Sequence, residues 1–145
     1  MDKVDLLCYE DISIGDEIPP LVKNPTLNEI KIFCRLYQEP EPNRFTDIAV
    51  AKKQGVPFLI IPGGLTIAYL SQLIIGWSPT ISISRLDVIF RGRIKQKDII
   101  HCRGLVTDKE VRQNTPYIDC DVFIEDSSGQ RPITGKATIQ IPSRS

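Results

Sequence analysis

The sequence predicts an α+β fold in which a curled antiparallel β-sheet wraps around one long buried helix. A stretch without any charge covers residues 56–84 and is mostly apolar over residues 59–77. Several segments after it alternate apolar and polar side chains with a period of two, as half-buried antiparallel strands do. The length of 145 residues suits one domain, so we expect a single domain over residues 1–145.

The central helix is expected to open at Pro62-Gly63-Gly64, because proline suits a first turn in which its missing amide is not needed. Residues 65–77 leave no polar face, and a helix that is apolar nearly all round is buried on nearly all sides. The stretch is long enough to cross a bilayer, but prolines and glycines interrupt it. We therefore interpret it as the core helix of a soluble protein and expect no membrane partner.

An edge strand and a helix are expected before this stretch. Residues 11–18 predict a turn and a short edge strand that ends at Pro19-Pro20. Thr26 and Glu29 have the spacing of a capping box, and apolar residues behind them recur at helical spacing. A helix is therefore predicted to start at this point.

A loop and a second, short helix are expected next. Pro40 and Pro42 force an irregular loop. Asp47 then opens a helix over residues 47–53, which Gly55 can close.

Four strands in a meander are expected after the central helix. The alternation after Pro79 slips in phase near Arg85, which predicts a bulge. A single sheet covers a helix on every side only if it curls around it, and a second copy of the sheet would complete the cover. This is the hot-dog arrangement, and it predicts a dimer. The expected strands lie within residues 81–90, 99–107, 118–125 and 133–141, with a turn at 126–129.

Composition excludes several classes of partner. Lysine plus arginine and aspartate plus glutamate number 18 each, so charge gives no case for nucleic acid, and a near-neutral chain favours self-association. The four cysteines are scattered, without a close pair typical of zinc or redox chemistry. We expect small buried thiols, no metal, no cofactor and a cytoplasmic protein, because the charged N-terminus lacks a signal core.

Several blocks of the sequence resemble the MaoC-like hydratases and dehydratases, a hot-dog family that includes (R)-specific enoyl-CoA hydratases and 3-hydroxyacyl dehydratases. Members add or remove water across the α,β double bond of acyl groups carried as thioesters of coenzyme A or acyl-carrier protein. The resemblance implies a role in fatty acid metabolism, without a cofactor. The blocks are residues 12–16, 47–57, 60–66 and 87–98.

The resemblance also implies that the catalytic pair is lost. In the family, an aspartate and a histidine five residues apart activate the water, and their places here hold Pro40 and Phe45. Pro62 stands where a second histidine commonly precedes the glycine of the buried helix. Imidazole suits this proton transfer because its pKa lies near neutrality, whereas phenylalanine cannot move a proton.

Three carboxylates near these places are the remaining catalytic candidates. Glu39 or Glu41 would serve as a base if the loop buried it and raised its pKa; the alternative is a solvated loop carboxylate. Asp47 is a candidate of the same kind or simply a helix N-cap. His101, the single histidine, lies far along the chain on an expected outer strand, where we expect a structural or surface role.

The substrate-binding candidates surround the start of the central helix. The amides of Gly63 and Gly64 would stabilise a polarised thioester carbonyl; alternatively, these glycines only permit close packing. A basic run from Arg85 to Lys97 would meet the phosphates of coenzyme A or phosphopantetheine, or form a solvated rim. The expected binding set is Phe45, Pro62, Gly63, Gly64, Arg91 and Arg93.

Three functions remain open from the sequence. The leading one is a non-catalytic acyl-thioester-binding subunit that works as a homodimer or with a second hot-dog chain. The second is an active hydratase, dehydratase or thioesterase that uses a loop carboxylate. The third is a structural or regulatory domain that binds no thioester.

Overall fold

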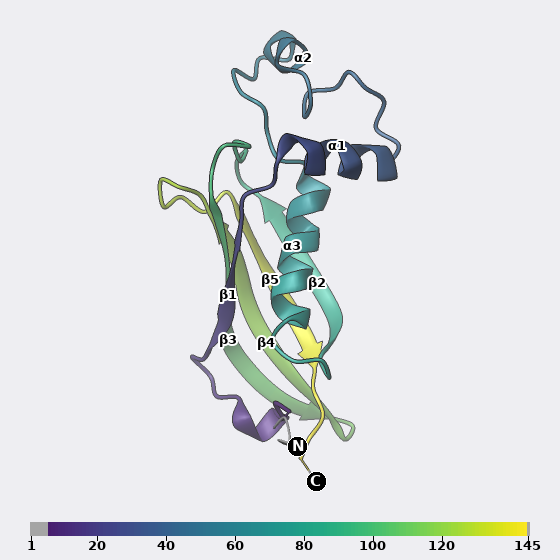
Figure 1. Cartoon of the computed structure of the whole chain (residues 1–145). Helices are drawn as coiled ribbons and strands as arrows, with labels where there is room; N and C mark the ends of the chain where they lie inside the picture. The colour runs from purple at the N-terminus through teal and green to yellow at the C-terminus, as the bar shows by residue number, and fades with distance from the viewer. Residues whose placement is uncertain (1–5, 145) are drawn as a thin grey trace, which may run out of the picture.

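The computed structural model describes residues 6–144 and places a central helix, α3, along one face of a five-stranded antiparallel sheet (Figure 1). Helices α1 and α2 lie beyond one end of the sheet, and the first and last described residues lie near the opposite end. The predicted α+β class is confirmed. The elements are, in chain order, η1 (Tyr9–Asp11), β1 (Glu17–Lys23), α1 (Leu27–Leu36), α2 (Ile48–Lys53), α3 (Gly63–Ile75), β2 (Ser82–Phe90), β3 (Ile100–Arg112), β4 (Thr115–Glu125) and β5 (Ile133–Gln140).

The strands lie in the order β1-β3-β4-β5-β2. Strands β3, β4 and β5 form a meander, but β2 pairs with β5 at the far edge instead of preceding β3. The expectation of a four-strand meander is therefore wrong for β2. Alternation of side chains specifies which face of a strand is buried, and it carries no information about which strand lies beside it.

Strand β1 continues through the proline pair, contrary to the expectation that it would end there. Its pairing with β3 shifts register between Ile18 and Leu21, so Pro19 and Pro20 lie in an irregular stretch of an edge strand. An edge strand tolerates proline at a bulge, because the missing amide faces away from the neighbouring strand.

The bulge predicted near Arg85 is confirmed, since the register of β2 with β5 shifts between Ile83 and Arg85. Strand β3 extends to Arg112, beyond the expected end at residue 107. Its hairpin with β4 turns through Gln113 and Asn114, both with positive φ, which is the geometry of a two-residue hairpin turn that suits the twist of the strands.

The predicted helix starts are confirmed. Thr26 Oγ1 accepts a hydrogen bond from the amide of Glu29 at 3.1 Å and caps α1. Asp47 Oδ1 accepts from the amide of Ala49 at 2.9 Å and caps α2. Gly55 follows α2 with a φ of 80°, a conformation that favours glycine.

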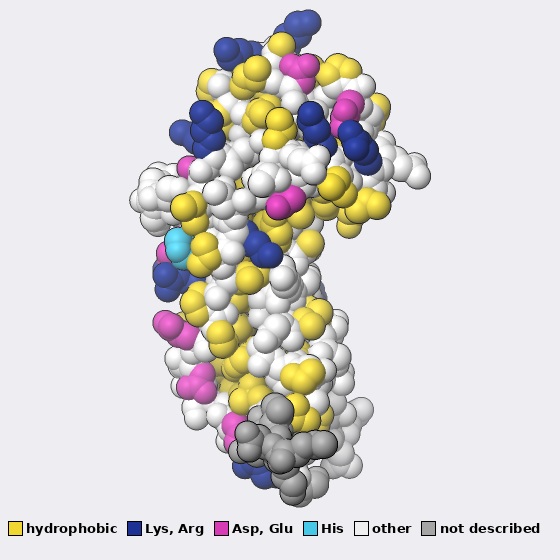
Figure 2. All heavy atoms as spheres, viewed as in Figure 1, with side chains coloured by type: hydrophobic (Ala, Val, Ile, Leu, Met, Phe, Trp, Pro, Cys, Tyr) yellow, Lys and Arg dark blue, Asp and Glu magenta, His cyan; other side chains and the backbone are white. Residues whose placement is uncertain are grey.

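Helix α3 is buried on one side only, so the expectation of burial nearly all round is wrong for the single chain. The open five-stranded sheet covers the side that carries Tyr69, Leu70, Leu73 and Ile74. The other side, which we call the open stripe, consists of Gly64, Ile67, Ala68, Gln72 and Ile75, all exposed. Figure 2 shows apolar side chains on this face, and the outline is hollowed below the end that carries α1 and α2.

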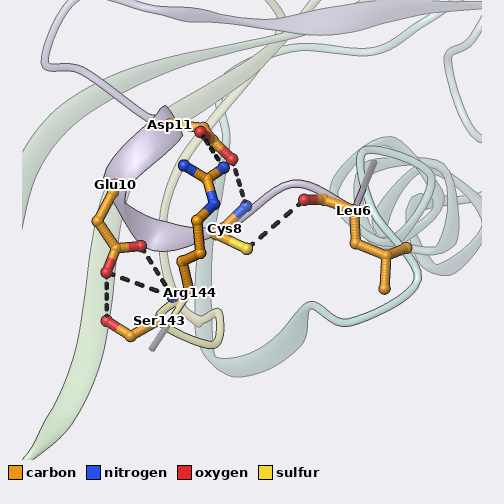
Figure 3. A network of polar contacts seen from close by, with 6 residues as sticks. All are labelled: Leu6, Cys8, Glu10, Asp11, Ser143 and Arg144. Atoms are coloured by element: carbon orange, nitrogen blue, oxygen red, sulfur yellow. Dashed lines mark hydrogen bonds and ion pairs between the residues drawn. The ribbon is translucent and has the colours of Figure 1, made fainter. Parts of the chain in front are cut away.

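A polar cluster, here called the terminal clasp, joins the two ends of the described chain (Figure 3). The Glu10 carboxylate accepts hydrogen bonds from Ser143 Oγ at 2.7 Å and from the Arg144 amide. The Arg144 guanidinium pairs with Asp11, whose other oxygen accepts from the Cys8 amide at 2.9 Å. The clasp holds the C-terminal segment against η1.

The helices of residues 6–144 are all too short or too polar to cross a membrane. The four cysteines are free. Cys102 and Cys120 lie in the core, where burial raises the pKa of each thiol to about 12, and Cys34 is buried as well. The expectation of four buried thiols is wrong for Cys8, which is half-buried.

Candidate functional site

A pocket of about 240 Å³ lies where the start of α3 meets the end of β2 and the loop before α2. Six of its eleven lining residues have apolar side chains, and two are arginines. Its lining residues are Arg44, Phe45, Ile60, Ile61, Gly63, Thr66, Phe90, Gly92, Arg93, Ile94 and Ile133.

Asn43 shapes the loop that brings Phe45 to the pocket. Its Oδ1 accepts hydrogen bonds from the Phe45 amide at 2.9 Å and from Thr46 Oγ1 at 3.3 Å, and its Nδ2 donates to the Pro40 carbonyl at 3.4 Å. Asn43 is 9% exposed, so little water competes for these bonds. The side chain thus sets the backbone on both sides of Arg44.

Gln96 ties this loop to the start of α3. Its Nε2 donates to the carbonyl of Phe45 and to the carbonyl of Ile60, the latter at 3.3 Å. The Gln96 amide also donates to the Leu59 carbonyl at 3.0 Å, and the Ile61 amide donates to the Ile94 carbonyl at 2.9 Å. The segments 59–61 and 94–96 are therefore hydrogen-bonded to each other, and the Gln96 side chain adds a hydrogen bond to Phe45.

The geometry of the two glycines at the start of α3 is compatible with both expected roles, which are close packing and free amides for a carbonyl. A Cβ on Gly63 would lie 3.1 Å from the Phe90 ring, and one on Gly64 would lie 3.1 Å from the Phe33 ring, so both permit close packing. Within residues 6–144, neither amide donates a hydrogen bond. Gly63 lines the pocket, whereas Gly64 lies on the open stripe.

The side chains on the pocket wall have one sign of charge. Arg44 and Arg93 line it, and no aspartate, glutamate, histidine or cysteine among residues 6–144 does. The Arg44 guanidinium lies 5.0 Å from the centre of the Phe45 ring, a cation–π geometry that holds it beside the pocket. The Thr66 hydroxyl donates to the Gly63 carbonyl at 2.6 Å.

The three carboxylate candidates lie outside the pocket lining. Glu39 and Glu41 are exposed, and Glu41 lies 3.8 Å from the Arg35 guanidinium. The burial on which a base role would depend is thus absent from the single chain. Asp47 is engaged in capping α2. Phe45, at the place of the expected histidine, does line the pocket. The catalytic roles of these carboxylates stay predictions.

The remaining candidates are not brought together. Pro62 is buried next to Gly63 and is not part of the lining. Arg91 lines a separate groove on the outer face of the sheet, where its Nε donates to Thr134 Oγ1 at 3.0 Å. Arg93, two residues on, reaches the pocket, so the two predicted binding arginines lie on different faces.

The rest of the basic run is dispersed as well. Arg85 pairs with Asp87 at 2.6 Å, and the Lys95 ammonium lies 5.0 Å from the centre of the Phe58 ring. His101 is half-buried on β3, between β1 and β4, so its expected place on an outer strand is wrong. The position of β3 depends on strand order, which the sequence pattern does not contain.

Sequence reasoning missed several residues of the site, among them Asn43, Arg44 and Gln96. Asn43 had a usable signal, because asparagine side chains commonly accept the amide two residues on in an Asx turn. Gln96 had none, since it contacts Phe45 from 51 positions away in the sequence. Arg44 precedes Phe45, which stands at the place of the expected histidine, and no sequence pattern marked Arg44 itself as a site residue.

The geometry suits binding better than proton transfer. An apolar wall, two cationic side chains and the positive end of a helix face one cavity. Among the described residues, the only charged side chains in its lining are the two guanidiniums. Within residues 6–144, no group of three or more histidine, cysteine or carboxylate side chains is placed to hold a metal ion.

No known family profile matches the sequence, and no curated protein matches it by sequence. Solved structures match its fold. R-hydratase PhaJ1 from Pseudomonas aeruginosa superimposes with a TM-score of 0.83 at 17% identity, over 96% of this chain and 88% of that one. A MaoC-like dehydratase from Rhodospirillum rubrum gives 0.80 at 18% identity, over 96% and 99%. The HadBC (3R-hydroxyacyl-ACP dehydratase) complex from Mycobacterium tuberculosis gives 0.73 at 13%, over 88% and 96%.

These similarities cover nearly the whole of each chain, whereas the identities are low. They compare the course of the backbone and do not test individual side chains. Together with the sheet order and the central helix, they show that this chain has the hot-dog fold, which it shares with solved hydratases and dehydratases.

Proposed function

We propose that this chain is a MaoC-like hot-dog subunit that binds acyl thioesters of coenzyme A or acyl-carrier protein and has no catalytic pair of its own. One observation carries the proposal. The pocket at the glycine-marked start of α3 is lined by Phe45, at the place expected for the catalytic histidine, and no carboxylate or imidazole of the described range 6–144 lines it.

The thioester carbonyl is proposed to lie at the start of α3, with its oxygen toward the Gly63 amide. The positive end of the helix stabilises a polarised oxygen there. The acyl group packs against the apolar wall, which includes Ile60, Phe90 and Ile94. A group bound in this way is held without being hydrated.

Binding is tested by thermal melting. A ligand that binds only the native state raises the Tm, so saturating butyryl-CoA should raise the Tm of the wild type. The Gly63→Val variant, whose side chain would enter the pocket, should lose this shift. Absence of any shift in the wild type would support a structural or regulatory domain instead.

Catalysis is tested by incubating the pure protein with short and medium enoyl-CoA esters and following the absorbance of the conjugated thioester. We expect no loss of absorbance above the rate of a heat-denatured sample. Turnover that Glu39→Gln or Glu41→Gln abolishes would refute the non-catalytic proposal and support the carboxylate mechanism.

A second hot-dog subunit is proposed to cover the open stripe and to supply the missing acid and base. The stripe exposes Ile67 and Ile75, at 36% and 52%, which a neighbouring helix would bury. Strand β2 is a sheet edge without proline, and such edges in native proteins are commonly covered. One of the structural neighbours, HadBC, is named as a complex.

Association is tested by light scattering on the wild type, on Ile75→Asp and on Val111→Asp. Val111 is 55% exposed near the β3–β4 turn and serves as a matched control. Each protein is measured alone and mixed with a hot-dog chain that carries the aspartate and the histidine. We expect the wild type and Val111→Asp to form mixed dimers with that chain, and Ile75→Asp to form none. A wild type that forms only a stable homodimer and never exchanges subunits with such a chain would contradict the proposed partner.

A further inference from the structure

The arginines of the chain differ in whether they have an acidic partner. Six of the nine lie within 4.0 Å of a carboxylate, and Arg91 donates to Thr134. No carboxylate in residues 6–144 pairs with the two that remain, Arg44 and Arg93. These two come from different segments, and both line the pocket.

The pocket thus combines two uncompensated cations with an apolar wall. No acidic side chain in the part of the chain that the structure describes lines it, although acidic and basic residues are equally numerous in the sequence. Both guanidiniums are exposed and therefore open to a ligand, and a guanidinium forms strong paired hydrogen bonds with a carboxylate or phosphate. The complementary ligand group is therefore an oxyanion.

We propose that the bound acyl group itself carries a carboxylate, which Arg44 and Arg93 hold, so that the preferred ligand is the thioester of a short dicarboxylic acid. This inference rests on the proposed function, because it assumes that the thioester lies at Gly63. It adds the chemical class of the acyl group.

The size of the pocket favours the acyl carboxylate over the phosphates of the carrier. Gly63 and both arginines line one cavity of about 240 Å³. The pantetheine arm of coenzyme A places the nearest phosphate much farther from the thioester than a cavity of this size extends. A carboxylate at the far end of a four-carbon acyl group is separated from the thioester carbonyl by only two methylene groups, which matches this scale.

The test uses N-acetylcysteamine thioesters, which contain no phosphate. Succinyl and butyryl groups have the same number of carbon atoms and differ in the terminal carboxylate. Titration calorimetry should show that the wild type binds the succinyl ester at least tenfold more tightly than the butyryl ester, since hydrogen bonds to charged groups are among the stronger ones. Added salt should reduce the difference.

Three variants locate the effect. Arg44→Gln and Arg93→Gln should each lose most of the preference for the succinyl ester. Arg91→Gln removes the same charge two residues from Arg93 but on the outer face, and it should keep the preference. The Tm of each variant, measured without ligand, verifies that the fold is intact, and all three arginines are exposed.

The outcomes separate this inference from the proposed function. Equal binding of the two esters overturns the inference and leaves acyl-thioester binding in place. Binding of neither these esters nor butyryl-CoA overturns both. If butyryl-CoA binds much more tightly than the butyryl N-acetylcysteamine ester and Arg44→Gln and Arg93→Gln remove that difference, the arginines recognise the carrier phosphate, and the inference is wrong.

Discussion

The charged side chains at the two ends of the molecule differ in whether they have partners within the chain. At the terminal clasp, Arg144 pairs with Asp11, and Glu10 accepts from Ser143, so each charged side chain has its partner within the chain (Figure 3). At the pocket, Arg44 and Arg93 face a cavity that no acidic side chain of the described residues lines. Charges satisfied internally hold a structure together, whereas charges left without a partner beside a cavity are available to a ligand.

The hydrogen bonds at the two ends differ in exposure as well. The clasp bonds are formed by exposed groups, where water competes and each bond stabilises little. The bonds of Asn43 and Gln96 are partly buried, where a lost partner is felt more strongly. Substitutions at the pocket should therefore change stability and binding together, and substitutions at the clasp should change stability slightly.

The largest effect is expected from Gly63→Val. The new side chain would meet the Phe90 ring, which lies 3.1 Å from the place of the Cβ, and overpacking of this kind typically destabilises by about 1–3 kcal/mol. It would also fill the pocket and abolish acyl-thioester binding. Gly64→Val is the matched control, because its Cβ would lie at the same 3.1 Å from an aromatic ring, that of Phe33, but Gly64 lies outside the pocket lining. It should destabilise to a similar extent in denaturant melts and keep ligand binding in calorimetry. Equal loss of binding in both variants would contradict the assignment.

Asn43→Ala is expected to follow. It leaves the part-buried Phe45 amide without its acceptor, and such a loss costs about 1–3 kcal/mol. Asn43→Asp keeps an acceptor oxygen and should retain most of the stability. Urea melts of the wild type and the two variants measure these differences in the free energy of unfolding. An alanine variant as stable as the wild type would show that the loop does not depend on this side chain.

Gln96→Leu should have a smaller effect, about 0.5–1.5 kcal/mol, because it removes one donor from two carbonyls that retain some access to water. The acyl-thioester Kd should rise, since Phe45 is no longer tied to the start of α3. Gln130→Leu is the control, as its exposed side chain donates no hydrogen bond within residues 6–144. Unchanged ligand affinity in Gln96→Leu would show that the position of Phe45 does not affect ligand binding.

The smallest effect is expected at the clasp, and it depends on pH. The Ser143 hydroxyl lowers the pKa of Glu10 from 4.5, and the Cys8 amide, followed by Arg144, lowers the pKa of Asp11 from 3.8. Because both values are lower in the folded state, the clasp stabilises the protein at neutral pH, and this contribution is lost as the pH falls through the lowered values.

The Arg144→Gln variant tests this dependence. It should lower the Tm slightly at pH 7 and have no effect at a pH below both pKa values, where the carboxyls are protonated in either state. Thermal melts across the acidic range follow the difference. An effect of Arg144→Gln that grows on acidification would have the wrong sign and would exclude the clasp as its origin.

Much of the fold could be predicted because its signals are local. The caps at Thr26 and Asp47 depend on residues two or three positions apart, and the bulge before Arg85 depends on a slip in alternation within one strand. An edge strand was predicted, but its course through Pro19-Pro20 could not be, because it depends on a shift in the pairing of β1 with β3. That pairing is a property of the whole sheet.

The residues of the candidate site also differ in whether a local sequence signal identifies them. Phe45 and Gly63 were found because they stand at places defined by a resemblance along the sequence. Arg93 was found with them, but nothing in the sequence separated it from Arg91, which the structure places on the other face. Gln96 escaped notice because its partner lies 51 positions away.

The sequence by itself determined the class of the fold, the start of α3 at Pro62-Gly63-Gly64 and the presence of phenylalanine at position 45. Periodicity and helix-start signals are properties of neighbouring residues, and position 45 holds phenylalanine in any fold. Only the tertiary structure decided that Arg44 and Arg93 share a cavity, that Arg91 does not, and that α3 keeps an open stripe. These facts depend on strand order and on long-range contacts, in which residues distant in the sequence come together only when the chain has folded.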